Sequence, residues 1–90
     1  MSNAIVGVSL PASMVGAMRD MLEAIGKADT PERVAVYMGE VRGALITLEL
    51  LQRLNRANAT RLYQHAAELA RVRERSLELT AMPAHPPAEA

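Results

Sequence analysis

The chain has 90 residues, enough for one small domain, and its ten basic and ten acidic side chains cancel. This balance removes the overall electrostatic field that would draw the protein to nucleic acid or to an anionic membrane surface. The chain has no cysteine, which excludes disulfides and thiolate metal sites, and no apolar run reaches the roughly 20 residues that span a bilayer.

The first ten residues are expected to form an arm ahead of the helices. Their side chains alternate between two faces of an extended chain: Ala4, Val6, Val8 and Leu10 lie on one, and Asn3, Ile5, Gly7 and Ser9 lie on the other. Alternation of this kind predicts a short strand or an extended arm.

A first helix is predicted over residues 11–25. Pro11 is tolerated in a first helical turn, and Ser9 precedes it as a candidate cap. The apolar side chains recur at intervals of three and four residues, as on one face of a helix: Met14, Val15, Met18, Met21, Leu22 and Ile25. Gly26 is expected to end this helix.

A second helix is predicted over residues 31–54, and its start is the clearest in the chain. Thr30 suits the N-cap and Pro31 the first helical position. Glu32 follows near the positive end of the helix dipole, where an acidic side chain is favourable.

A third helix is predicted over residues 59–79, after a 55–58 linker whose last residue, Asn58, serves as the cap. Its apolar face comprises Leu62, Ala66, Leu69, Ala70, Val72 and Leu77. A connection of about four residues makes the second and third helices an antiparallel hairpin. Residues 82–90 contain three prolines and are expected to be a disordered tail. The sequence thus predicts an all-α fold of three helices, with an arm at 1–10 and a helical domain at 11–81.

The second predicted helix has two apolar faces. The wider one must face the other helices of the chain, and it comprises Val34, Tyr37, Met38, Val41, Ala44, Leu45, Leu48 and Leu51. A second stripe comprises Val36, Gly39, Gly43, Ile46, Leu50 and Leu54. Three helices leave little to cover this stripe, so we predict that it is a homodimer interface. Coverage by the first helix or by the N-terminal arm of the same chain is the alternative.

Two glycines lie four residues apart on the second stripe. Gly39 and Gly43 each cost roughly 1 kcal/mol relative to alanine inside a helix, so they call for a structural reason. The Gly-x-x-x-Gly spacing is best known in membrane helices, where small residues let two backbones touch. We infer that another helix approaches closely at these positions.

The sequence contains no recognisable catalytic or cofactor-binding constellation. His65 and Glu68 lie one turn apart, but a metal site usually needs three or four ligands, so we expect an exposed histidine and no metal. No serine lies in a nucleophile elbow, and no glycine-rich phosphate loop occurs. Arg71 and Arg75 alternate with acidic residues on a solvated helix face, and Arg73 lies nearer the apolar side. We therefore expect neither enzyme activity nor a cofactor.

Residues 3–50 resemble ribbon-helix-helix repressors and the DNA-binding half of some antitoxins. The resemblance is carried by Val8-Ser9-Leu10-Pro11, by a helix with Met14, Met18 and Leu22, and by Gly26 ahead of a capped second helix. In that family the strands of two chains pair into a ribbon that enters the major groove of DNA. The resemblance implies that Asn3, Ile5, Gly7 and Ser9 read the bases. Because residues 1–18 have no basic side chain for phosphate contacts, we rank DNA binding as the alternative.

The stretch from Tyr37 to Leu45 also looks like segments of small helical proteins encoded by phages and mobile elements, which would suit an inhibitor or an adaptor. Our leading interpretation is a non-enzymatic helical protein-binding module of the cytoplasm, homodimeric through the second helix, that docks on a protein partner. The alternative is a ribbon-helix-helix DNA-binding repressor or antitoxin. Neither interpretation involves a membrane.

Overall fold

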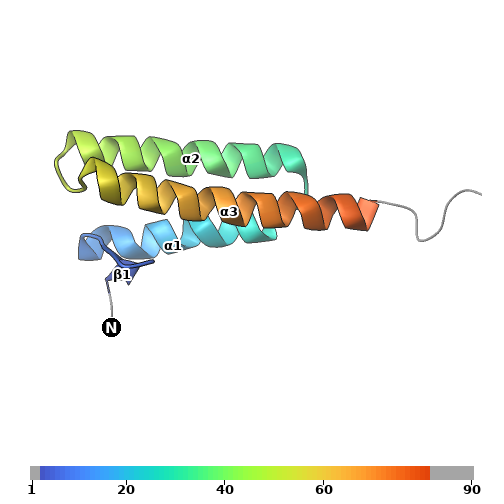
Figure 1. Cartoon of the computed structure of the whole chain (residues 1–90), viewed down its shortest axis with the longest axis horizontal. Coiled ribbons are helices and arrows are strands. Elements are labelled where there is room, and N and C mark those ends of the chain that lie inside the picture. Colours follow the sequence, from blue (N-terminus) through green and yellow to red (C-terminus); the bar gives the residue numbers. More distant parts are fainter. Residues whose placement is uncertain (1–2, 82–90) are drawn as a thin grey trace, which may run out of the picture.

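Figure 1 shows a computed structural model of the chain, which describes residues 3–81. Three helices lie side by side: α1 spans Ala12–Lys27, α2 spans Pro31–Leu50 and α3 spans Arg56–Ala81. An antiparallel pair of short strands, β1 (Ala4–Ile5) and β2 (Val8–Ser9), precedes them. Because α2 and α3 run antiparallel and pack together, the predicted all-α fold with a helical hairpin is confirmed. The tail predicted at residues 82–90 lies outside the described residues.

The N-terminal arm is a hairpin with a two-residue turn. Ile5 pairs with Val8, and the turn residues Val6 and Gly7 have φ values of 45° and 79°. Positive φ at both positions is the type I′ geometry, which matches the twist of two paired strands. The alternating faces predicted for this arm are therefore wrong. Since the chain reverses at the turn, Ile5, Val8 and Leu10 are all buried, while Val6 is exposed.

The starts of α1 and α2 differ in how they are capped. No side chain caps α1, because Ser9 is held in the hairpin and Pro11 occupies the N-cap. The predicted start of α2 is confirmed. The Thr30 hydroxyl accepts a hydrogen bond from the Arg33 backbone N–H at 3.1 Å, and Pro31 is the first helical residue.

The end of α2 lies at Leu50, four residues before the predicted end. Gln52 has a left-handed φ of 59°. Its N–H donates to the Glu49 carbonyl at 2.9 Å, and the Arg53 N–H donates to the Leu48 carbonyl at 2.8 Å. These two bonds form a Schellman motif, in which the left-handed residue is usually glycine. Because glutamine stands here instead, the sequence pattern did not mark the end of the helix.

The start of α3 lies at Arg56, three residues before the predicted start. The Asn55 side-chain oxygen accepts a hydrogen bond from the Asn58 backbone N–H at 2.8 Å, so Asn55 is the cap and Asn58 is not. The altered connection exchanges the expected roles of two leucines. Leu51, predicted in the core, is 63% exposed, and Leu54, predicted on the second stripe of the second helix, is 7% exposed.

The core lies between the three helices. The N-terminal β-hairpin covers one side of it, with β1 packed on α1 and β2 packed on α3. No polar or charged side chain within residues 3–81 is buried. The buried helical residues are Val15, Met18, Leu22, Ile25, Val34, Val41, Leu45, Leu48, Ala59, Leu62, Ala66 and Ala70. The prediction for Val72 was wrong, since it is 59% exposed. The inner face of α3 centres on Ala66 and Ala70, and Val72 projects away from it.

Truncation of the inner face of α2 tests this packing. Leu45→Ala and Leu48→Ala are each expected to lower the free energy of unfolding by about 2–5 kcal/mol, because both side chains are buried and their loss leaves a cavity. Leu51→Ala removes the same atoms from an exposed site and should change the free energy of unfolding by less than about 0.5 kcal/mol. Urea denaturation followed by circular dichroism measures all three. An equal loss in Leu51→Ala would contradict the described α2–α3 connection.

The left-handed residue at the end of α2 provides a second test. Gln52→Gly is expected to raise the free energy of unfolding by about 0.5–1 kcal/mol, because a side chain carrying Cβ is strained in this conformation and glycine is not. Gln52→Ala keeps the Cβ and should bring no gain. Thermal and urea denaturation of the two variants compare them directly. Stabilisation by alanine as large as that by glycine would contradict the left-handed conformation.

Candidate functional site

The candidate site is the side of α2 that faces away from the core. Five of the six residues predicted for the second stripe lie together there, and we call them the outer face: Val36, Gly39, Gly43, Ile46 and Leu50. The side chains of Val36, Ile46 and Leu50 are 58%, 48% and 77% exposed. The sixth predicted residue, Leu54, is not part of it. It lies beyond the end of α2 and is buried in the core.

No described element of the chain covers the outer face. α2 lies along one margin of the bundle, and the hairpin lies at the opposite side, beside α1 (Figure 1). Beyond the neighbouring backbone of α2 itself, a Cβ atom added at Gly39 or Gly43 would meet no heavy atom within 4 Å. Coverage of this face by α1 or by the N-terminal arm, the alternative considered from the sequence, is therefore wrong for these five residues. The fold within residues 3–81 supplies no steric reason for either glycine.

The outer face carries no charge between residues 35 and 50. Ala35 and Thr47 lie beside these five residues on α2, and both are also exposed. The Thr47 hydroxyl donates to the Gly43 carbonyl at 2.9 Å, so its hydrogen is used within the helix. A solvated helix face normally carries charged side chains, whereas this one is apolar with two glycines near its centre. Such a surface is suited to contact with another apolar surface.

Charged side chains border the outer face on both edges. At about 100° per residue, Glu40 falls on one edge and Arg42 and Glu49 fall on the other. Glu49 is bonded to Arg56 of α3, Oε2 to Nε, at 2.7 Å, and this hydrogen bond raises the pKa of Arg56 above its ordinary value. Glu40 and Arg42 differ from Glu49, because neither side chain makes a hydrogen bond or ion pair with any of residues 3–81.

A groove between α2 and α3 adjoins the Arg42 edge, and sequence reasoning missed it. It has a volume of about 440 Å³, and it is lined by Arg42, Leu45, Ile46, Glu49, Arg56, Ala59, Thr60 and Tyr63. Tyr63 is 38% exposed, and Ile46 belongs to both the groove and the outer face. The signal that could have found the groove is Tyr63 itself, a rare aromatic residue off the predicted apolar face of the third helix.

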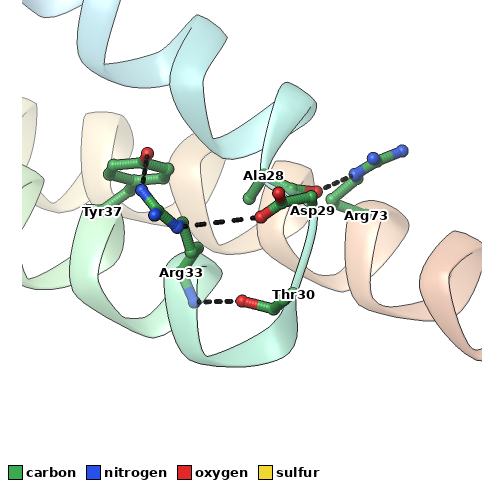
Figure 2. A network of polar contacts seen from close by, with 6 residues as sticks. All are labelled: Ala28, Asp29, Thr30, Arg33, Tyr37 and Arg73. Carbon is green, nitrogen blue, oxygen red and sulfur yellow. Dashed lines mark hydrogen bonds and ion pairs between the residues drawn. The ribbon is translucent and has the colours of Figure 1, made fainter.

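The N-terminal end of α2 is fixed by a network of polar contacts (Figure 2). Arg33 pairs with Asp29, Nε to Oδ1, at 3.7 Å and donates to the Tyr37 hydroxyl at 3.5 Å. The hydrogen bond with Tyr37, together with the charge of Asp29, raises the pKa of Arg33 above its ordinary value. From α3, Arg73 reaches the same connection and donates its Nε–H to the Ala28 carbonyl at 2.6 Å. This bond ties α3 to the turn between α1 and α2.

Removal of the Arg73 side chain tests the network. Arg73→Ala is expected to lower the free energy of unfolding by about 1.5–3 kcal/mol, because the bond is charge-assisted and leaves the Ala28 carbonyl unpaired when lost. Arg75→Ala, at an exposed position of the same helix, is the matched control and should change stability by less than about 0.5 kcal/mol. Urea denaturation gives both values, and equal values would contradict the bond.

The four residues that the ribbon-helix-helix resemblance assigns to base contacts do not share a face. Asn3 and Ser9 are exposed, Ile5 is buried against the helices, and Gly7 occupies the turn. The prediction of an outward side chain was wrong for Ile5. The chain reverses between Ile5 and Val8, so both side chains point into the core.

Within 3–81 no three His, Asp, Glu or Cys side chains are placed to hold a metal ion, and His65 is half-buried on α3. None of the helices described in Figure 1 is long and apolar enough to cross a membrane. Comparison with known protein families, with curated proteins and with solved structures found no match.

Proposed function

We propose that this protein is a non-enzymatic helical binding module that forms a homodimer through the outer face of α2. In this proposal the dimer docks on a protein partner in the cytoplasm as an adaptor or an inhibitor. The observation that carries the proposal is the uncovered, uncharged outer face, with Val36, Ile46 and Leu50 exposed around two glycines.

The energetics of the two glycines support a contact with another helix. Each destabilises an isolated helix by roughly 1 kcal/mol relative to alanine. Neither glycine is required by a positive φ, and neither touches a neighbouring element of the described chain. A surface without side chains lets a second backbone approach closely, which brings Val36, Ile46 and Leu50 into contact with the partner helix. Their burial then adds hydrophobic stabilisation that the single chain lacks.

A leucine substitution separates association from folding. Gly43→Leu should raise the dissociation constant of the dimer by about tenfold or more, because the side chain forces the helices apart. The variant should retain its helicity by circular dichroism, since open space surrounds Gly43 and leucine is the better helix former. Equilibrium sedimentation over micromolar concentrations measures the association.

Gly16→Leu is the matched control for this experiment. Gly16 lies inside α1, is exposed and also has no heavy atom within 4 Å of a built Cβ, but its neighbours one turn on are Arg19 and Asp20. This variant should dimerise like the wild type. A second variant, Leu50→Glu, places a charge in the proposed contact and should also give monomers. A wild-type protein that sediments as a monomer at hundred-micromolar concentration would overturn the homodimer.

A further inference from the structure

The two charged side chains nearest the glycines of α2 are disposed symmetrically about the outer face. From the geometry of an α-helix, Glu40 and Arg42 each lie about 80° around the axis from the middle of this face, on opposite edges. They differ by two residues, which is about 3 Å along the axis. Both lie within the segment from Gly39 to Gly43, where the proposed contact is closest.

These two side chains lack partners within the described chain, whereas the other charged groups of α2 between residues 33 and 49 have them. Arg33 forms an ion pair with Asp29, and Glu49 forms an ion pair with Arg56. No hydrogen bond or ion pair joins the side chain of Glu40 or Arg42 to any residue in the range 3–81. The fold therefore leaves one carboxylate and one guanidinium available at the margins of the uncovered face.

We propose that a second copy of this chain packs its α2 parallel to the α2 of the first copy. The two-fold axis of this dimer is parallel to the two helices and lies between them. This inference rests on the proposed homodimer and specifies its geometry. Rotation about such an axis brings each edge of one helix against the opposite edge of the other. Glu40 of each copy then faces Arg42 of the other, and two ion pairs flank the glycine contact.

The antiparallel arrangement produces the opposite electrostatics. Its two-fold axis is perpendicular to the helices, so each edge of one helix meets the same edge of the other. With the crossing centred between Gly39 and Gly43, Glu40 faces Glu40 of the second copy, and Arg42 faces Arg42. Juxtaposed like charges disfavour an interface and set its register as much as attractive pairs do. Charge complementarity at Glu40 and Arg42 therefore favours the parallel dimer.

The shape of the bundle allows this approach. α1 and α3 both lie on the core side of α2, so a second α2 meets the outer face before it meets any other helix (Figure 1). Gly39 and Gly43 lower the surface at the crossing point, and Val36 and Leu50 extend the apolar contact toward the two ends. The exposed Val72 and Leu79 of α3 remain free for a different partner.

Neutralising both charges distinguishes the two arrangements by the sign of the effect. The double variant Glu40→Gln, Arg42→Gln keeps the net charge at zero. In a parallel dimer it removes two ion pairs and should raise the dissociation constant by about three- to thirtyfold. In an antiparallel dimer it removes two repulsions and should lower the dissociation constant. Glu74→Gln, Arg75→Gln on α3, also charge-neutral, is the matched control and should leave dimerisation unchanged.

The exchanged pair Glu40→Arg, Arg42→Glu completes the test, because it restores both ion pairs of a parallel dimer with their direction reversed. Its dissociation constant should lie within about threefold of the wild-type value. Equilibrium sedimentation measures all variants. A tighter or unchanged dimer after neutralisation, or an exchanged variant as weak as the neutral one, would overturn the parallel arrangement. A wild type that is monomeric at hundred-micromolar concentration would instead overturn the homodimer itself.

A distance measurement tests the direction of the helices independently of charge. The chain has no cysteine, so a spin label on Leu51→Cys is unique and lies at an exposed position beside the end of α2. In a parallel dimer the two labels lie at the same end, roughly 10–25 Å apart. In an antiparallel dimer crossing at Val41 they are separated by about 30 Å along the axis alone. The longer distance would overturn the proposal.

Discussion

Two helices can cover only one side of a third, and the rest of this structure follows from that limit. α1 and α3 bury the side of α2 that carries Val34, Val41 and Leu45, and the N-terminal hairpin packs on α1 and α3. No other described element is available for the opposite side, yet this side is apolar too. A surface helix normally carries polar and charged side chains on the side that faces away from the core. The proposed homodimer therefore rests on the uncovered face of α2.

The stability of the single chain depends on apolar packing and on closed helix ends. No polar or charged side chain of the described range is buried, so the core carries no desolvated polar side chain that must be paired. Thr30 and Asn55 each accept a hydrogen bond from one backbone N–H at the starts of α2 and α3, and backbone bonds close the end of α2. A domain of this size buries a modest share of its surface, so any area added by self-association raises its stability.

The number, order and inner faces of the helices could be predicted from the sequence, because the apolar side chains repeat at the helical period and Thr30-Pro31 marks a start. Five of the six residues predicted for the second stripe lie together on one face of α2. The errors lie where the local backbone conformation determines the direction of the chain. The hairpin turns at Val6, where asparagine is usual, and α2 stops at Gln52, where glycine is usual. Because neither residue is typical of its position, the sequence did not indicate that the chain changes direction there. The predicted positions of Ile5, Leu51 and Leu54 were therefore wrong.

The bond between Arg73 and the Ala28 carbonyl has a consequence for kinetics. Its two ends are 45 residues apart in the chain. It forms only after α3 has docked on the turn between α1 and α2, whereas the α2–α3 hairpin closes over a much shorter loop. An interaction that is absent from the folding transition state affects the rate of unfolding more than the rate of folding. We therefore expect loss of the Arg73 side chain to raise the rate of unfolding more than it lowers the rate of folding.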